Sequence, residues 1–407
     1  MILENVKGFR DILYPDSLKR QKIKEIIERN FKLFGFMPIE TSTIEYDEFA
    51  RGENEKGEAV SDRFRLKDRG GRELSLRYEF TFQLKRIFKE NPNIKLPFRR
   101  YQVGYNFRDE PITKDRYREF MQCDADIIGE EDIISDAECI FLGDKICKDL
   151  GIKYELILNN RKLLNLILEK SGIKNKELVS KELDKINKLE EKEVKENLIN
   201  LINKKEADFL FKLLKKDLKY FLREQFDGAE ELNKLISLCK KNQIDVKFSA
   251  FLIRGFSYYT GNIFEGYVKE IKGSVFAGGR YDNLVGKYIN RQIPAVGISF
   301  GRILDYPNIK TEGVNCLIIS IDQDEESIEL VKKLREKEIS CFIMKKINKA
   351  LDYAAKMDIP FVVFVGKDEI KEKKIKLREM KTGKEKLLGL KELIQKLTKL
   401  KDIFKNR

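Results

Sequence analysis

The chain has 407 residues, which is more than a single folded domain usually contains. Its 81 Lys and Arg against 68 Asp and Glu give a formal charge of +13, which favours a polyanionic partner. Histidine is absent, which excludes a Ser-His-Asp triad, a Cys-His pair and His-ligated zinc, so catalysis would depend on positioned charges and carboxylates. The six cysteines form no CxxC pair and no apolar run approaches the roughly 20 residues that cross a bilayer, so we expect a cytoplasmic protein with reduced thiols and no membrane segment.

The first predicted helix follows a short polar entry. Residues 7–11 read Lys-Gly-Phe-Arg-Asp, and from Ile23 to Phe34 apolar residues recur at helical spacing. Gly35 is a typical helix end, and residues 36–41 then predict a strand. The chain therefore opens with an amphipathic helix that leads into a sheet.

Two strands are predicted around the glycine pair Gly70-Gly71, which is a common turn. The second of these strands is expected to run to Thr81. Glu79 and Thr81 lie two residues apart, so on a strand they share a face and offer a carboxylate and a hydroxyl to an amino group. An ordinary edge strand is the alternative.

Residues 100–129 predict a β-hairpin with one charged loop. By the two-residue period of a strand, the apolar side chains of both arms share one face: Tyr101, Val103, Tyr105, Phe107, Met121, Cys123, Ala125 and Ile127. The polar side chains share the other face: Asn106, Arg108, Glu110, Gln122, Asp124 and Asp126.

The polar face of this hairpin has two interpretations. Charges on an antiparallel sheet are usually no more than a solvated face. Alternatively, an Arg fork binds phosphate or carboxylate oxygens while a Gln and an Asp accept from an ammonium group. The second interpretation makes the face a site for a zwitterion beside a phosphate.

Beyond the hairpin the pattern predicts a helix over residues 131–150 and a strand over 154–159. From 171 to 241 the composition shifts to Lys, Glu and Leu at helical spacing with almost no Pro, which predicts a helical insertion. A solvated bundle is the plain interpretation of that insertion.

A second group of unusual residues follows the insertion. Residues 253–261 read IRGFSYYTG, and residues 277–282 read AGGRYD. Tyr, Gly and Arg alternating in strands indicate backbone that approaches a ligand closely. Residues 294–301, PAVGISFG, then predict a strand that runs into a helix.

The last hundred residues predict a separate α/β unit. Strands over 314–321, 340–344 and 360–366 alternate with helices near 324–337 and 348–358, the pattern of a parallel sheet. A hairpin around Thr382-Gly383 and a closing helix from Leu390 to Ile403 follow. No GxGxxG is present, so a dinucleotide-binding fold gets little weight.

Taken together, these motifs resemble those of class II aminoacyl-tRNA synthetases, and within them the histidyl-tRNA synthetases. Residues 107–110, 116–120 and 122–129 resemble motif 2, and 294–301 resemble motif 3. Residues 253–261 and 277–282 resemble the two histidine-specific signatures, which are more specific together than alone. The resemblance covers nearly the whole chain and is weakest in the insertion.

The resemblance implies an α+β architecture built on a class II antiparallel sheet with flanking helices. The catalytic domain would comprise residues 1–170 and 242–310, interrupted by the helical insertion 171–241. Residues 311–407 would form an α/β domain like the family's anticodon-binding domain. In the family an insertion at this place leans over the acceptor arm of the tRNA, which makes its basic face a candidate contact.

The implied activity is the ATP-dependent activation of L-histidine, with Mg²⁺ accompanying the nucleotide, and transfer to tRNA(His) by a homodimer. Arg108 and Arg254 would be catalytic, gripping the α-phosphate and the carboxylate. The implied ATP-binding residues are Arg108, Glu110, Arg116 and Arg254. The implied histidine-binding residues are Glu79, Thr81, Arg108, Gln122, Asp126, Arg254, Tyr258 and Tyr259, the last two with Asp126 around the imidazole. No metal ligands of the protein's own are expected.

Three positions depart from the family pattern: Tyr78 replaces a Pro, Ser257 an Asp, and Leu304 the motif 3 arginine. Arg302 sits two residues before Leu304, about 200° around an α-helix, so it would serve only with a different local backbone. Leu304 favours a non-catalytic paralogue, such as the synthetase-like regulatory subunit of ATP phosphoribosyltransferase. A synthetase-derived RNA-binding protein is a third hypothesis.

Overall fold

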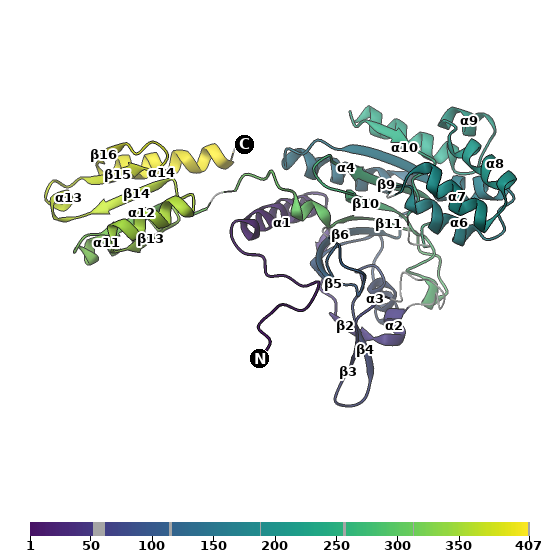
Figure 1. Cartoon of the computed structure of the whole chain (residues 1–407), viewed down its shortest axis with the longest axis horizontal. Helices are drawn as coiled ribbons and strands as arrows, with labels where there is room; N and C mark the ends of the chain where they lie inside the picture. Colours follow the sequence, from purple (N-terminus) through teal and green to yellow (C-terminus); the bar gives the residue numbers. More distant parts are fainter. Residues whose placement is uncertain (52–61, 114–115, 188, 255–257, 312, 406–407) are drawn as a thin grey trace. The chain divides into compact units, whose positions relative to one another are not determined.

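The computed structural model describes residues 1–51, 62–113, 116–187, 189–254, 258–311 and 313–405. They divide into two compact units, Met1–Pro307 and Asn308–Arg407, each of which is treated by itself (Figure 1). Among these residues no helix has both the length and the apolar character needed to span a membrane.

The described part of the first unit is built on an eight-stranded sheet in the order β1-β5-β6-β11-β10-β9-β7-β8. The six strands from β5 to β7 pair antiparallel, whereas the edge pairs β1-β5 and β7-β8 are parallel. The strands are β1 (Met37–Pro38), β5 (Phe98–Phe107), β6 (Glu119–Ile128), β7 (Glu155–Asn160), β8 (Val246–Phe248), β9 (Asn262–Tyr267), β10 (Ser274–Arg280) and β11 (Ala295–Phe300). The expected α+β fold with a large sheet is confirmed.

Helices flank this sheet and a separate small sheet, with α2 (Asp47–Arg51) against strands of the small one. The helices are α1 (Asp16–Leu33), α2 (Asp47–Arg51), α3 (Gln83–Glu90) and α4 (Ile133–Asp149), and the small sheet has the order β2 (Ile44–Tyr46), β4 (Glu73–Leu76), β3 (Arg65–Lys67). The Phe31 ring of α1 lies 5.1 Å from Tyr101 on β5 and 5.9 Å from Phe300 on β11. Burying one such aromatic side chain contributes about 1.5–3 kcal/mol, so these contacts hold α1 on the sheet.

The β5-β6 hairpin has the two faces that the sequence predicts. Its register sets Arg100 opposite Asp126 and Gln102 opposite Asp124. The apolar face is buried in part, with Tyr101 at 5% and Tyr105 at 39% exposed, and the polar face is buried at Arg100, Asp124 and Asp126, which are at most 5% exposed. The interpretation as a solvated face is therefore wrong.

Three expectations about local structure are wrong, and a fourth, the strand over 36–41, is met only in part. Residues 77–81 form no strand, because the Glu79 side chain instead accepts a hydrogen bond from Phe82 N at the start of α3. The strand expected over 36–41 is only β1, and described residues 251–254 and 258–261 are irregular. The helix expected after β11 is the short 3₁₀ turn η4 (Arg302–Asp305), which ends before Pro307.

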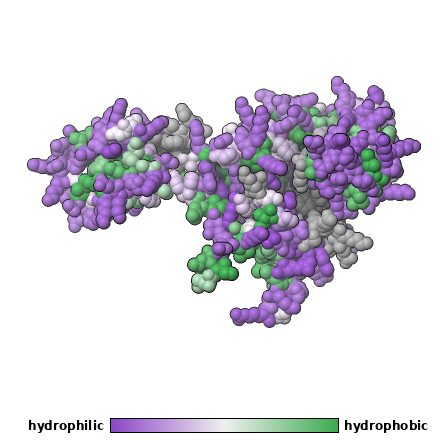
Figure 2. All heavy atoms as spheres, in the orientation of Figure 1, coloured by the Kyte–Doolittle hydropathy of each residue, from purple (hydrophilic) through white to green (hydrophobic). Residues whose placement is uncertain are grey.

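Residues 171–241 are helical, as predicted. After α5 (Arg161–Lys170) come α6 (Lys176–Leu183), η2 (Asp184–Asn187), α7 (Glu191–Leu201), α8 (Lys204–Leu214), α9 (Leu218–Arg223) and α10 (Ala229–Lys241). Figure 1 shows α6 to α9 gathered at one end of the unit. Hydrophilic side chains cover these helices on the face seen in Figure 2, while Leu210, Phe221 and Leu235 are buried among them.

The second unit is a five-stranded sheet with helices. Its elements are β12 (Cys316–Ser320), α11 (Asp324–Arg335), β13 (Cys341–Met344), α12 (Ile347–Lys356), β14 (Phe361–Val365), α13 (Lys367–Lys371), β15 (Ile375–Glu379), β16 (Glu385–Leu388) and α14 (Leu390–Lys405). In the order β13-β12-β14-β15-β16, the first three strands are parallel and the hairpin β15-β16 is antiparallel. Ile318 and Ile319 lie in separate apolar clusters, so both sheet faces are buried and the strand is continuously apolar.

Candidate active site

Two adjoining cavities lie on the polar face of the central sheet. The smaller has a volume of about 50 Å³ and the larger about 290 Å³. Both are lined by Arg108, Gln122, Arg254, Ala277 and Ser299. These shared residues mark the place where one cavity opens into the other.

The side chains assigned from the sequence fall on these two cavities. The smaller is lined by all eight predicted amino-acid-binding residues: Glu79, Thr81, Arg108, Gln122, Asp126, Arg254, Tyr258 and Tyr259. The larger is lined by all four predicted nucleotide-binding residues: Arg108, Glu110, Arg116 and Arg254. Residues from three separate stretches of the sequence therefore meet at one site.

Buried carboxylates make the smaller cavity acidic. Glu79 Oε1 accepts from Phe82 N at 2.8 Å, and the Tyr258 hydroxyl lies 3.5 Å from Oε2. Burial, helped by the charge of Asp124, raises the pKa of Glu79 to about 7. Burial likewise raises the pKa of Asp124 to about 7, against the hydrogen bond from Ser299. A cationic ligand would restore the ionised state of these groups.

A chain of hydrogen bonds fixes Gln122 between the strands. Its amide oxygen accepts from Asn106 Nδ2 at 2.7 Å, and its amide nitrogen donates to Ser299 Oγ at 2.8 Å. Ser299 in turn donates to Asp124 Oδ1 at 2.5 Å. Because every member is tied to a neighbouring strand, the cavity wall is preorganised.

Asp126 is held by two buried partners. Arg100 Nη2 lies 2.5 Å from Asp126 Oδ2, and the Tyr281 hydroxyl donates to Oδ1. Burial raises the pKa of Asp126, while the Arg100 charge opposes that shift. Gly297 on the adjacent strand makes room, since a Cβ there would lie 2.1 Å from Asp126 Oδ1. The carboxylate is thus fixed in place at the base of the cavity.

Two arginines stand where the cavities join. Arg254 Nη1 donates to Glu265 Oε1 at 2.9 Å, and its buried Nε has no hydrogen-bond partner among the described residues. The guanidinium carbon of Arg108 lies 4.3 Å from the Tyr78 ring centroid and 4.9 Å from that of Phe120. Stacking between two rings holds the guanidinium flat, and Arg108 Nε also donates to the carbonyl of Tyr78 at 3.4 Å.

The larger cavity carries an excess of positive charge. Six arginines line it: Arg10, Arg20, Arg108, Arg116, Arg254 and Arg302. They face three carboxylates, those of Glu110, Glu119 and Asp305. Arg116 pairs with Glu110 at 2.7 Å, and burial raises the pKa of Glu119. The cavity therefore suits a ligand with several negative charges.

Comparison with known proteins identifies the family. The family model described as histidyl-tRNA synthetase matches residues 8–302, and the one described as anticodon binding domain matches residues 315–400. The chain belongs to the histidyl-tRNA synthetase family. It is 35% identical over 420 residues to histidine–tRNA ligase 1 of Bacillus cereus, covering 95% of this chain and 97% of that protein.

Solved structures agree on the fold. A histidyl-tRNA synthetase from Nostoc superposes with a TM-score of 0.84 at 23% identity, over 98% of this chain and 99% of the other. An ATP phosphoribosyltransferase regulatory subunit/histidyl-tRNA synthetase from Bacillus halodurans gives 0.73 at 22% identity, over 89% and 98%. At these identities the likeness establishes the histidyl-tRNA synthetase fold alone.

The motif 3 region of this histidyl-tRNA synthetase family member departs from an α-helix. Leu304, at the position of the family's arginine, is 1% exposed and lies in the core beside Ile303. Arg302 instead lines the larger cavity, and its Nη1 donates to the carbonyl of Lys272. The local backbone is thus different in the way that brings Arg302 to the site. Ser257, the second departure, lies outside the described residues.

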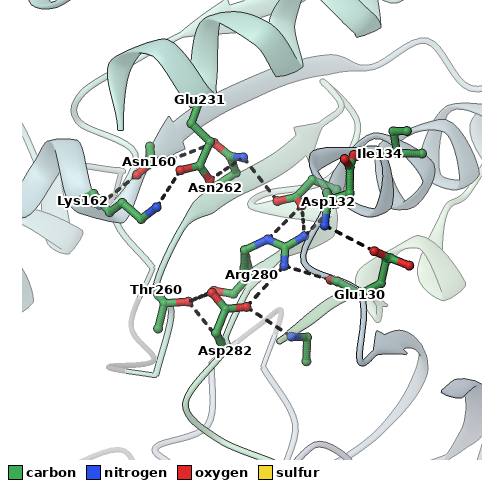
Figure 3. A network of polar contacts seen from close by, with 12 residues as sticks. Glu130, Asp132, Ile134, Asn160, Lys162, Glu231, Thr260, Asn262, Arg280 and Asp282 are labelled. Atoms are coloured by element: carbon green, nitrogen blue, oxygen red, sulfur yellow. Dashed lines mark hydrogen bonds and ion pairs between the residues drawn. The ribbon is translucent and has the colours of Figure 1, made fainter. Parts of the chain in front are cut away.

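A largely buried polar network around Arg280 joins β10 to α4 and to the insertion helix α10 (Figure 3). Arg280, at the end of β10, donates from Nε to Asp136 Oδ2 on α4 at 3.0 Å and from Nη2 to the carbonyl of Asp132 at 3.1 Å. Asn262 donates both to Asp136 and, at 3.2 Å, to Glu231 of the insertion helix α10. Since Tyr281 follows Arg280 directly, this network fixes the strand that places its hydroxyl on Asp126.

Sequence reasoning assigned no role to several side chains of the site: Arg10, Arg20, Arg100, Asp124, Tyr281 and Ser299. The sequence did contain a signal for Arg100. It lies an even number of residues before Asn106 and Arg108, so on a strand its side chain shares their polar face. Asp124 was likewise placed on the polar face by the two-residue period, whereas Arg10, Arg20, Tyr281 and Ser299 come from other segments that only the tertiary fold brings to the cavities. No group of three or more His, Cys, Asp or Glu suited to a metal occurs among the described residues.

Proposed function

We propose that the chain is a histidine–tRNA ligase. It joins the carboxylate of L-histidine to the α-phosphate of ATP, releases pyrophosphate, and then passes the histidyl group to the 3′-terminal ribose of tRNA(His). Family membership supports this proposal, and the two cavities supply its chemistry.

The observation that carries the proposal is the junction of the two cavities. An acidic pocket suited to the amino group and imidazole of histidine opens into an arginine-lined cavity suited to a triphosphate. Arg108 and Arg254 lie at the opening. The two reacting groups, a carboxylate and an α-phosphate, are both anions that must meet between these guanidinium groups.

The chain's own residues then take the following roles. Arg108 and Arg254 neutralise the charge that builds up as the carboxylate oxygen attacks the α-phosphate, and Arg116 with Glu110 lies further along the nucleotide. Glu79, Thr81 and Gln122 accept from the α-ammonium group. Asp126, Tyr258 and Tyr259 contact the imidazole, and Asp126 is kept in position by Arg100 and Tyr281.

The remaining partners follow from the family. Mg²⁺ enters with ATP as part of the substrate, and the Glu110 and Glu119 carboxylates on that cavity are oxygen donors of the kind it takes. Residues 311–407 bind the tRNA anticodon, and 171–241 approach the acceptor arm beside the catalytic parts 1–170 and 242–310. The enzyme works in the cytoplasm as a homodimer, for which twice the chain mass in light scattering is the test.

Two assays test the proposal. ATP–pyrophosphate exchange across all twenty amino acids should respond to histidine alone, and a tRNA(His) transcript should be charged with histidine. Exchange with another amino acid, or with none, would overturn the proposal.

A non-catalytic regulatory paralogue is the second candidate, and it is favoured by Leu304 in place of the motif 3 arginine and by the fold shared with the Bacillus halodurans protein. Arg302 on the larger cavity and the match of residues 315–400 to the anticodon binding domain favour the ligase. Charging of the transcript separates the two, because the paralogue would give none.

A further inference from the structure

The N-terminal segment forms part of the wall of the larger cavity. Gly8, at φ +90°, accepts from Arg118 N at 2.9 Å, and a Cβ there would overlap the Arg118 side chain at 2.7 Å. The Phe9 ring stacks on Phe107 at 6.5 Å. These contacts dock the segment onto the end of the β5-β6 hairpin and deliver the next residue, Arg10, to the cavity.

Arg10 and Arg20 share one carboxylate. Arg10 Nη2 lies 3.0 Å from Asp305 Oδ1, and Arg20 Nη1 pairs with the same oxygen. The Arg10 guanidinium carbon also lies 3.8 Å from the Tyr117 ring centroid. Two guanidinium groups paired with one carboxylate leave a net positive charge. Within the described part of the chain, Asp305 accepts from one nitrogen of each guanidinium: Arg10 Nη2 and Arg20 Nη1. Both therefore retain N–H donors for a further anion.

The position of this pair along the site decides which anion it meets. Arg108 and Arg254 line both cavities, whereas Arg10 and Arg20 line the larger one alone. The pair therefore lies outside the set of residues shared by the two cavities, between which the carboxylate and the α-phosphate would meet. Arg20 is 13% exposed and Asp305 is 49% exposed, so the guanidinium is the member of the pair set into the wall.

On the proposed function as a basis, we propose that Arg10 and Arg20, positioned by Asp305, bind the outer phosphates of ATP and the pyrophosphate that leaves. They form a second cationic clamp beside Arg116. Together with Arg302 they supply charge to a cavity whose motif 3 position holds a buried Leu304.

Equilibrium titration of the full-length protein with ATP and with AMP tests the clamp. In Arg10→Gln and Arg20→Gln, the dissociation constant for ATP should rise about ten-fold or more, because each variant loses a charge-assisted hydrogen bond to phosphate. The dissociation constant for AMP should stay within about two-fold, since AMP has no outer phosphates. Arg29→Gln is the matched control, because Arg29 lies on the same helix as Arg20 but pairs with Asp149 away from the cavity.

Unchanged ATP affinity in both variants, or equal losses for ATP and AMP, would overturn the clamp. Arg10 and Arg20 come from different segments, so one informative variant remains if the other fails to fold. Wild-type exchange activity tests the proposed function separately: its absence counts against the ligase, while the ATP and AMP titrations still decide the clamp.

Discussion

Replacing Glu79 with Gln should remove a pH dependence of stability that the wild-type protein carries. Glu79 is buried, and its pKa rises from 4.5 to about 7 on folding, because of burial first and the Asp124 charge second. A carboxyl with a raised pKa holds its proton more tightly in the folded state. The free energy of unfolding therefore falls as the pH rises above the unfolded value, and the loss is complete above the folded value.

The magnitude follows from these two pKa values. At about 1.4 kcal/mol per pKa unit, the full loss at high pH is about 3.4 kcal/mol. The linkage relation places roughly 2 kcal/mol of that loss between about pH 5.5 and about pH 8. Asp124 titrates in the same range and is coupled to Glu79, so the measured proton release belongs to the pair.

Urea unfolding at the two pH values measures this difference. Only Tyr353 of the 15 tyrosines lies beyond residue 307 and tryptophan is absent, so tyrosine fluorescence follows the first unit. Glu79→Gln should be more stable than wild type, by about 3 kcal/mol at about pH 8 and about 1 kcal/mol at about pH 5.5. Glu196→Gln, at a side chain 63% exposed on α7, should match wild type. Parallel pH profiles for wild type and Glu79→Gln would refute the reasoning.

Three further outcomes are expected. Arg254→Ala should lower histidine-dependent exchange by about 10²-fold or more with an unchanged circular dichroism spectrum, and undiminished exchange would remove Arg254 from the mechanism. Leu304→Arg should destabilise the first unit by about 3 kcal/mol or more, since it buries an unpaired charge, and a stable, more active variant would contradict this placement. Asp136→Asn should cost about 1.5–3 kcal/mol in urea unfolding, because it removes the nearer of the two carboxylates that pair with Arg280 while Asp282 remains at 3.3 Å, and an unchanged midpoint would show that the pair contributes little.

Much of the fold was readable from periodicity. The two-residue period sorted the β5-β6 hairpin into its two faces, and the shift to Lys, Glu and Leu marked the helical insertion. In the second unit, continuous apolar runs gave the strands β12 and β14. These patterns are local, so a sequence displays them directly.

What failed depends on contacts between distant residues. Glu79 and Thr81 were expected on a strand, but the Glu79 carboxylate instead accepts from Phe82 N in the turn before α3, and β-propensity does not register such a contact. The polar hairpin face is buried because distant segments contact it: the Phe80 carbonyl accepts from Arg100, and the Tyr281 hydroxyl donates to Asp126. At the cavity Arg10 and Arg20 both pair with Asp305, which lies 285 residues after Arg20, a contact that no spacing rule could predict.

The departure at Tyr78 also gains a physical account. A proline there would offer no π face, whereas the Tyr78 ring stacks on Arg108 at 4.3 Å and its hydroxyl lies 3.5 Å from Glu110. The substitution thus stiffens one of the two arginines at the cavity junction. Tyr78 thereby acts on Arg108, which lines the same cavity as Arg302, the arginine two residues before Leu304.

The buried carboxylates bear most directly on whether this chain is catalytic. Glu79, Asp124 and Asp126 lie around a cavity of about 50 Å³, and burial raises the pKa of all three. By the linkage argument, Glu79 alone costs about 3 kcal/mol at high pH, a large fraction of the 5–15 kcal/mol that stabilises a typical domain. A protein without a cationic ligand would gain stability by replacing such a group. Their presence beside Arg108 and Arg254 therefore argues for a working amino-acid site. Histidine should raise the free energy of unfolding of the first unit most at high pH, where Glu79 is charged and, without histidine, has no cationic ligand beside it.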